Sequence, residues 1–385
     1  MGEKVAIIGV GQTKYTRARD DVNMIELVHE AVRTALNDAG IARKDLDAVV
    51  FGNMEFFEGT LMTDLMCVDG TGAYLKPSMK IQTGGTSGAA VASGAYYHVA
   101  SGLFDVVLAI GFEKLSDTVH AQSSLMLGDP LYGRWLASGV PASAALQARR
   151  YMYKYGAKEE DFALPVVKNR ENAMRNPYAH MREKVTMEDV LNSRILAEPI
   201  RLLHSCPQSD GACAMILASK KKAKEISDNP AWIKGIASSS DTPRHSDRDM
   251  AEAASFQSAK ERAYKMAGIE NPRKQIDVAE LYDAFAPQEL IWYEIAGLCK
   301  RGEGAKLIKD GVTTIDGELP VNTSGGVISS NPIGATAMVR IAEAAQQVRG
   351  LAGEHQVPDV ETALAHGWGG GLPQFNVVTV LSKSL

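Results

Sequence analysis

The sequence predicts an α/β fold that contains two copies of one unit. Apolar, β-branched segments alternate with segments of helical spacing, which indicates a mostly parallel sheet covered by helices. Two patterns also recur in the same order. Ala-Gly-Ile at 39–41 returns at 267–269, and a Gly-Gly pair followed by small residues at 84–90 returns at 325–336. The period is far too long for a solenoid, so we interpret the repeat as a duplicated α/β unit.

The first copy can be followed element by element. Its strands are the apolar runs, and its helices are the stretches with apolar residues three and four positions apart. The predicted order is a strand at 5–10, a helix at 23–39 that ends at Gly40, a strand at 47–52, a helix and a buried strand within 88–111, and a strand at 211–218.

The stretch 116–199 interrupts this pattern. It is polar, helical in places and rich in Tyr, Met and Arg. We therefore expect an inserted loop subdomain that lies over the active face. The predicted division is an N-terminal half at 1–115 and 200–240, the insertion at 116–199, and a C-terminal half at 241–385.

Composition narrows the classes of function. The 385 residues are 45% hydrophobic and 23% charged, as in globular proteins, and the net charge of -5 gives no reason to expect a nucleic-acid partner. No apolar stretch is long enough to span a membrane, and the four scattered cysteines form neither a zinc motif nor a disulfide framework. We expect a cytoplasmic protein with no signal peptide and no bound metal.

Six further motifs, taken in order, resemble those of the thiolase superfamily, in its sterol-carrier-protein and archaeal branch. They are GFEKL at 111–115, SDGA at 209–212, GEG at 302–304, PVNTSGG at 320–326, PIGAT at 332–336 and AHGWGG at 365–370. The resemblance covers essentially the whole chain. It implies a five-layered αβαβα architecture, a homodimer and a coenzyme A (CoA) cleft under the insertion. For this branch it also implies a small zinc-ribbon/OB-fold partner of the DUF35 type.

A glycine stands at the position of the family's cysteine nucleophile. A thiolase carries that cysteine in a Cys-x-Ser-Gly setting where a helix begins, and the matching stretch TGGTSG at 83–88 puts Gly85 there. Glycine has no side chain and cannot form an acyl-enzyme. The backbone N–H groups of the helix N-terminus can still bind an oxyanion.

Two more functional positions of the family are changed. The motif ELYDAF at 280–285 puts Tyr282 where the family has an Asn or His, and a tyrosine can give or take a proton at a hydroxyl or carbonyl oxygen. The alternative is a half-buried core tyrosine. Asn331 replaces the histidine that activates the cysteine, and its amide can donate to a thioester oxygen but cannot transfer protons.

The C-terminal glycine loop contains the remaining titratable candidate. The resemblance implies that His366 is the second acid or base, with a structural histidine as the alternative. The backbone N–H groups of Gly369 and Gly370 are candidates for an oxyanion hole.

Contacts to CoA are assigned to four residues. Arg244 and Arg248 are candidates for its phosphates, with solvent as the alternative. The resemblance implies that Ser324 and Gly325 also contact CoA. Among the cysteines, Cys206 and Cys213 are interpreted as buried packing residues, and Cys67 is the only candidate for a relocated nucleophile.

Three functions remain open. The leading hypothesis is a retro-aldol cleavage of a bulky 3-hydroxyacyl-CoA in which Tyr282 and His366 share the proton chemistry; steroid side-chain retro-aldolases of the superfamily have a comparable Tyr-Asp-x-Phe. The first alternative is thiolysis of a bulky or aryl 3-oxoacyl-CoA by direct attack of CoA. The second is a non-catalytic CoA-binding scaffold subunit.

Overall fold

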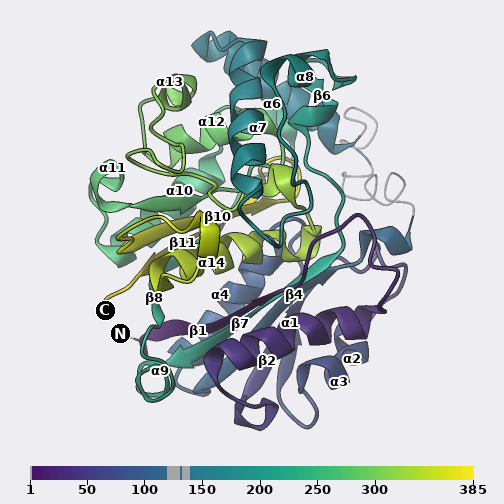
Figure 1. Ribbon diagram of the computed structural model, residues 1–385, viewed down its shortest axis with the longest axis vertical. Coiled ribbons are helices and arrows are strands. Elements are labelled where there is room, and N and C mark those ends of the chain that lie inside the picture. The colour runs from purple at the N-terminus through teal and green to yellow at the C-terminus, as the bar shows by residue number, and fades with distance from the viewer. Residues whose placement is uncertain (1, 119–130, 132–138) are drawn as a thin grey trace.

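A computed structural model describes residues 2–118, 131 and 139–385 of the chain (Figure 1). Part of the predicted insertion, at 119–130 and 132–138, therefore lies outside the described residues. None of the described helices combines the length and the apolar character needed to cross a membrane.

The first half begins as the spacing predicted. Helix α1 starts at a capping box in which Asn23 and Glu26 satisfy each other's backbone N–H groups, and it ends at Gly40 in the left-handed conformation. The strands of this half are β1 (Val5–Gln12), β2 (Ala48–Gly52), β3 (Ser78–Lys80), β4 (Val106–Glu113) and β7 (Gly211–Ser219). Its helices are α1 (Met24–Ala39), α2 (Thr63–Met66), α3 (Val68–Thr71), α4 (Ser87–Ala100) and α9 (Lys220–Ile226).

The second half repeats the arrangement. Its strands are β8 (Ala231–Ser240), β9 (Val278–Glu280), β10 (Thr362–Gly369) and β11 (Phe375–Ser382). Its helices are α10 (Ala254–Ala267), α11 (Pro272–Gln275), α12 (Ala286–Ile295), α13 (Gly304–Lys309) and α14 (Ile333–Arg349). The strands of both halves join in the order β3-β2-β4-β7-β1-β8-β11-β10-β9, which is nearly symmetric about the β1–β8 contact.

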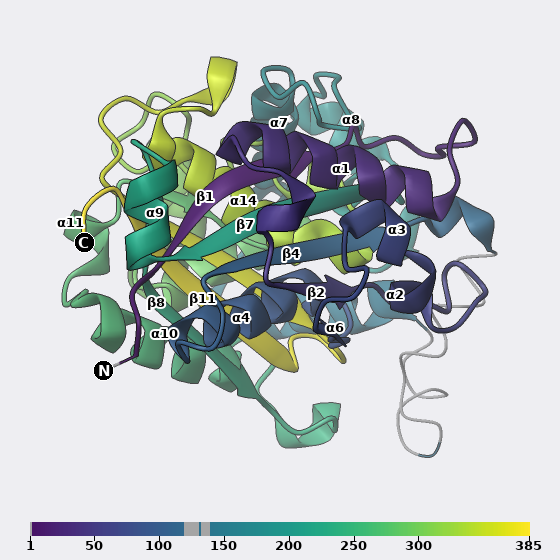
Figure 2. The same cartoon turned by 90° about the horizontal axis from the view of Figure 1, so that it is seen from below.

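The layers follow from which helix covers which strands. Helices α4 and α14 pack on each other, α4 against β4 and β2 and α14 against β10 and β4, so both lie between the two half-sheets. Helix α1 covers the outer side of β1 and β7, and α10 covers β8 and β11 (Figures 1 and 2). This is the five-layered αβαβα arrangement, and the predicted fold class is confirmed.

The prediction of a mostly parallel sheet was wrong. β2 runs parallel to β3 and β4, and β9 runs parallel to β10, but the other neighbouring pairs of this sheet are antiparallel. For β7 the physical reason is the long excursion before it, because a chain that returns from so far away needs no helical crossover and can enter from the opposite end. For β10 and β11 it is the short connection between Gly369 and Phe375, which makes neighbouring strands antiparallel. The pairing also places β8, which the sequence division put in the N-terminal half, along β11 of the second half. The division itself stays a prediction.

The described part of the insertion forms a helical layer above the second half. It contains α6 (Val140–Tyr155), α7 (Glu159–Ala173), α8 (Met187–Asn192) and the small hairpin of β5 (Ile195–Ala197) and β6 (Ile200–Arg201). Helix α7 packs on α12, α13 and α8, and α6 packs on the hairpin. The helical layer therefore packs on α12 and α13, the helices that follow β9 in the chain.

Candidate active site

A cavity of about 360 Å³ opens where the two halves and the insertion meet. Its walls are mostly apolar, and its polar groups carry no formal charge at neutral pH. The lining residues are Gly85, Val140, Pro141, Leu196, Leu202, Ser205, Cys206, Pro207, Gln208, Tyr282, Ala284, Phe285, Asn331, Ile333, Trp368 and Gly370. An apolar cavity with a few convergent polar groups is typical of a small-molecule site.

Gly85 lies in the turn that leads into α4, and its surroundings leave little space for a side chain. A β-carbon added there would stand 3.0 Å from the Trp368 carbonyl oxygen and 3.0 Å from the Tyr282 hydroxyl oxygen. These separations are shorter than the usual contacts of carbon with oxygen. The hydroxyl of Tyr282 therefore occupies the space into which a nucleophilic side chain at this position would project.

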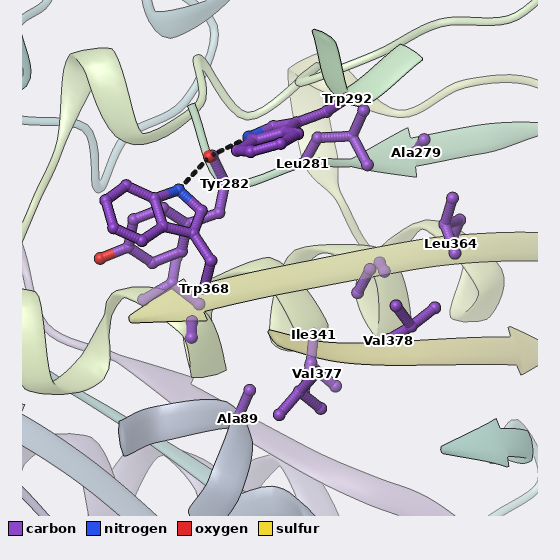
Figure 3. Packing of buried hydrophobic residues seen from close by; sticks show 14 of the residues in the cluster. Ala89, Ala279, Leu281, Tyr282, Trp292, Ile341, Leu364, Trp368, Val377 and Val378 are labelled. Carbon is purple, nitrogen blue, oxygen red and sulfur yellow. Dashed lines mark hydrogen bonds between the residues drawn. The ribbon is translucent and has the colours of Figure 1, made fainter. Parts of the chain in front are cut away.

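Tyr282 lies two residues after β9, and hydrogen bonds to its backbone carbonyl hold it in place. Its carbonyl oxygen accepts hydrogen bonds from the indole nitrogens of Trp292, at 2.8 Å, and Trp368, at 3.0 Å, as Figure 3 shows. The side chain is 2% exposed. Burial, and next the nearby Cys206, raises the pKa of the Tyr282 hydroxyl far above its usual value of 10.0, so the group is neutral at physiological pH.

Asn331 is oriented by hydrogen bonds on both sides of its amide. Thr336 Oγ1 donates to Asn331 Oδ1 at 2.8 Å, and Asn331 Nδ2 donates to Cys206 Sγ at 3.2 Å. The amide N–H groups of Asn331 are thereby turned toward the cavity, where one of them remains for a ligand.

Cys206 lines this cavity, so its interpretation as a residue of the packing alone is corrected. Burial, and next the charge of Asp283, raises the pKa of its thiol to about 12, which keeps it protonated. Asn331 cannot take the proton. Cys67 is fully buried in the other core cluster, beneath α1, and does not line the cavity.

The structure does not bring His366 to the cavity. The imidazole lies flat on Phe256 with ring centroids 3.8 Å apart, and its Nε2 donates to Asn376 Oδ1 at 2.9 Å. Burial lowers the pKa of His366 to about 3. Its side chain is on the same face of β10 as Trp368, but one pleat deeper, and it is Trp368 that lines the cavity.

The glycine loop after β10 reaches the cavity in part. Gly370 lines it, whereas Gly369 packs so closely on Thr86 at the start of α4 that a β-carbon would stand 2.6 Å from the Thr86 amide nitrogen. Arg248 is half-buried beside this loop and donates from its guanidinium to the Gly371 carbonyl oxygen. Arg244 is exposed nearby in the chain. Arg248 thus contacts the residue next to Gly370, which lines the cavity.

Ser324 and Gly325 lie in a buried network beneath α7 and do not line the cavity. Ser324 Oγ donates to Glu280 Oε2 at 2.6 Å and accepts from Arg340 at 2.7 Å. Gly325 has a φ of +97° and lies against Ala173. Because their polar atoms and their space are taken by neighbours, these two residues support the strand ends rather than face a ligand.

Sequence reasoning missed three contributors to the site. Cys206 lies three residues before a motif that was recognised, Thr336 lies inside one, and Trp368 lies inside the glycine loop. Their types gave no functional signal, since each is common in protein cores. The described residues contain no group of three or more His, Cys, Asp or Glu side chains arranged for a metal ion.

Comparison with known proteins agrees with the motifs. The family model for the thiolase N-terminal domain matches residues 5–221, and the thiolase C-terminal domain-like model matches residues 237–383. An acetyl-CoA acetyltransferase of Methanothermobacter thermautotrophicus is 38% identical over 95% of this chain and 96% of its own. The benzoylsuccinyl-CoA thiolase subunit BbsB of Thauera aromatica is 32% identical over 96% and 95%. The solved Ltp2–ChsH2(DUF35) aldolase superposes with a TM-score of 0.84 at 29% identity, over 99% of this chain and 98% of that one.

Proposed function

Because this chain belongs to the thiolase superfamily and is an enzyme acting on acyl-CoA, we propose that it cleaves a bulky 3-hydroxyacyl-CoA by a retro-aldol reaction, without an acyl-enzyme. The observation that carries the proposal is the Tyr282 hydroxyl, which fills the space above Gly85 in an apolar cavity. The site thus offers a proton carrier where a thiolase has a nucleophile. The solved relative that is an aldolase supports the same choice.

In the proposed reaction the reactive form is the small fraction of Tyr282 that is ionised, and this phenolate takes the proton of the substrate's 3-hydroxyl group. The electrons of that O–H bond form the new carbonyl, the bond between carbons 2 and 3 breaks, and its electron pair becomes the enolate of the shortened acyl-CoA. Tyr282 then returns the proton to carbon 2. The products are a ketone or aldehyde and an acyl-CoA, and no proton is gained or lost overall. One tyrosine can therefore do what the sequence assigned to Tyr282 and His366 together.

The enolate oxygen needs hydrogen-bond donors that are fixed in advance. Asn331 Nδ2 is the side-chain donor on the cavity wall, and the backbone N–H groups of Gly85 and Gly370 are the candidates beside it. Each of these residues lies in a turn or at the end of a loop. Inside a strand, its backbone N–H group would instead be hydrogen-bonded to a neighbouring strand.

The walls define the substrate class. The apolar side chains of Leu196, Leu202, Phe285, Ile333 and Trp368 suit a hydrocarbon-rich acyl group. Arg248, and Arg244 farther out, remain the proposed contacts for CoA phosphates, at the side of the cavity formed by the glycine loop.

Two assemblies are also proposed. The solved aldolase relative contains a DUF35 protein, and a DUF35-type subunit is the heterologous partner we expect here. A homodimer would pair the β3 edge strands of two copies. Strand β3 ends the sheet, and around it Tyr74, Leu75 and Met79 are 68%, 87% and 48% exposed. A cytoplasmic location stays a prediction.

The experiment that tests the reaction compares Tyr282→Phe with wild type on a panel of apolar 3-hydroxyacyl-CoA substrates. Loss of the proton carrier should lower kcat at least about a hundredfold. Since burial raises the pKa of Tyr282, the wild-type rate should rise by up to about tenfold per pH unit through the alkaline range, with no plateau near neutral pH.

Tyr264→Phe is the matched control. Tyr264 is also buried, its hydroxyl donates to the Ala296 carbonyl oxygen, and neither residue lines the cavity, so its loss should leave kcat unchanged. Cleavage of 3-oxoacyl-CoA by added CoA, at a rate that Tyr282→Phe does not lower, would instead establish direct thiolysis.

A further inference from the structure

The turn that leads into α14 is held by the segment 206–209. Ser209 Oγ accepts a hydrogen bond from the backbone N–H of Asn331 at 3.1 Å, and the backbone N–H of Ser209 donates to the Asn331 carbonyl oxygen at 3.3 Å. Cys206, in the same segment, accepts from the Asn331 amide. Ser209 is fully buried, so water does not compete for these bonds. The position of Ser209 therefore fixes the backbone from which the Asn331 amide projects.

His180 of the insertion, between α7 and α8, contacts the same turn twice. Its backbone N–H donates to Ser330 Oγ at 2.9 Å, and its imidazole Nδ1 lies 2.9 Å from Ser209 Oγ. One residue of the insertion thus contacts both the residue before Asn331 and the hydroxyl group that holds Asn331.

The hydrogen bonds between these groups run in one direction. Ser209 Oγ accepts from Asn331, so the hydroxyl proton of Ser209 is free to be donated to His180. Burial, and next the nearby arginine side chains, lowers the pKa of the His180 imidazole below its usual 6.5, so the ring is neutral at neutral pH. With its proton on Nε2, the neutral ring accepts at Nδ1. Bonds arranged in such a chain polarise and strengthen one another.

We propose that His180 is a positioning residue for the oxyanion donor: it holds Ser209, and through Ser209 it holds the Asn331 amide in the orientation that the enolate needs. The inference rests on the role of Asn331 in the proposed function. It gives the insertion a part in catalysis, although His180 does not line the cavity. It also gives the SDGA motif at 209–212 a task in the reaction.

The test removes the acceptor at position 180 and then restores it. His180→Phe keeps an aromatic ring without an acceptor and should lower kcat roughly two- to tenfold, the worth of one neutral hydrogen bond. KM should change less, because the Asn331 amide acts chiefly on the enolate. His180→Asn places a side-chain oxygen near the position of Nδ1 and should recover most of the rate. His98→Phe is the matched control, because His98 is also half-buried and its Nδ1 bonds to the Gly94 carbonyl oxygen of its own helix.

Ser209→Ala tests whether His180 acts through Ser209. Alone it should lower kcat about as much as His180→Phe does, and the double variant should be little worse than the worse single variant. Losses that multiply in the double variant would mean that His180 acts by another route, and they would overturn the inference. Ser209→Ala removes a single oxygen atom, so it gives an answer even where His180→Phe folds poorly.

A readout that needs no cleavage separates this inference from the proposed function. A bound straight-chain 3-oxoacyl-CoA can ionise to its enolate, which absorbs in the near ultraviolet, and fixed donors at the oxygen raise the enolate fraction. The ratio of enolate to keto form should fall roughly two- to tenfold in His180→Phe and in Ser209→Ala, and it should recover in His180→Asn.

The possible results have distinct meanings. Ratios equal to wild type in His180→Phe and Ser209→Ala, or a wild type that binds no enolate, would overturn the positioning role, even where wild type cleaves 3-hydroxyacyl-CoA. The expected ratios in a wild type that cleaves no 3-hydroxyacyl-CoA would support the positioning role and overturn only the proposed function.

Discussion

The hydroxyl oxygen of Tyr282 stands 3.0 Å from the point that a β-carbon on Gly85 would occupy. The two residues are far apart in the chain and belong to opposite halves of the duplicated fold, yet each determines what the other can be. Any larger residue at position 85 would crowd the tyrosine hydroxyl, and the tyrosine hydroxyl in turn crowds any side chain placed there.

Substitution of Gly85 should therefore cost stability and restore no thiolase chemistry. Gly85→Ala is expected to lower the free energy of unfolding by about 1–3 kcal/mol, as overpacking does, and Gly85→Cys by at least as much. Urea denaturation measures the cost. In a Tyr282→Phe background the cost of Gly85→Ala should be smaller by about 0.5 kcal/mol or more, because one of the two close oxygens is gone. An equal loss of unfolding free energy in both backgrounds would show that the Tyr282 hydroxyl does not crowd the side chain at position 85.

No cysteine should carry an acyl group during turnover. Burial raises the pKa of Cys67, Cys206 and Cys299 to about 12, so their thiolate fractions at neutral pH are negligible. Cys206→Ser should keep most of its activity, and intact-mass spectrometry of wild type after incubation with acyl-CoA should show the unmodified mass. An adduct of acyl mass on Cys206 would replace the retro-aldol proposal with a relocated nucleophile.

His366 should matter for stability in acid rather than for turnover. Its pKa is lowered from the usual 6.5 to about 3 in the folded protein, so the unfolded chain binds more protons between these values. The buried, neutral His366 therefore costs the folded protein no stability above about pH 6.5. As the pH falls from 6.5 toward 3, the unfolded chain takes up a proton that the folded protein does not, and the free energy of unfolding decreases. Thermal unfolding of wild type should therefore depend more steeply on pH in this window than that of His366→Gln.

The same variant tests catalysis. His366→Gln should keep a kcat within a few-fold of wild type, because the imidazole lies outside the cavity. A loss of about a hundredfold or more in kcat, without loss of stability, would return His366 to the proton path that the sequence predicted.

The proposed homodimer depends on the edge of β3. Met79→Lys places a charge beside the unpaired edge and should shift the protein to monomers. Leu351→Lys is the matched control, since Leu351 is also 48% exposed but lies after α14. Light scattering measures the mass of each variant. A wild type that is monomeric at micromolar concentration, or a Met79→Lys variant that stays dimeric, would exclude this interface.

The sequence could predict the fold because its signals are local. Asn23, Glu26 and Gly40 fix the ends of α1 by capping chemistry, and the structure has those ends. Strand direction carries no such signal: an apolar run such as 211–218 reads the same whether its neighbours run parallel or antiparallel. The mixed sheet therefore had to be seen in the structure.

The site residues also fall into two groups: those that a local motif predicts, and those whose place depends on the tertiary structure. Motif position predicted that Gly85, Tyr282 and Asn331 belong to one site, and all three line the same cavity. It could not place His366, because a strand residue two positions farther along occupies the same face, and only the depth of the cavity decides which of the two reaches it. Thr336 gained its importance from a contact with Asn331 across a helix end, which spacing alone does not predict.

The position of α14 between both half-sheets affects how the protein can be made. On the ribosome, β1 to β7 emerge long before residues 333–349, and until then the inner face of the first half-sheet lacks one of its two covering helices. During synthesis the first copy of the duplicated unit therefore keeps part of its apolar sheet face exposed, and exposed apolar surface favours aggregation. Because α14 contacts β4 and β7 of the first copy as well as β10 of its own, we expect the two copies to fold together rather than one after the other.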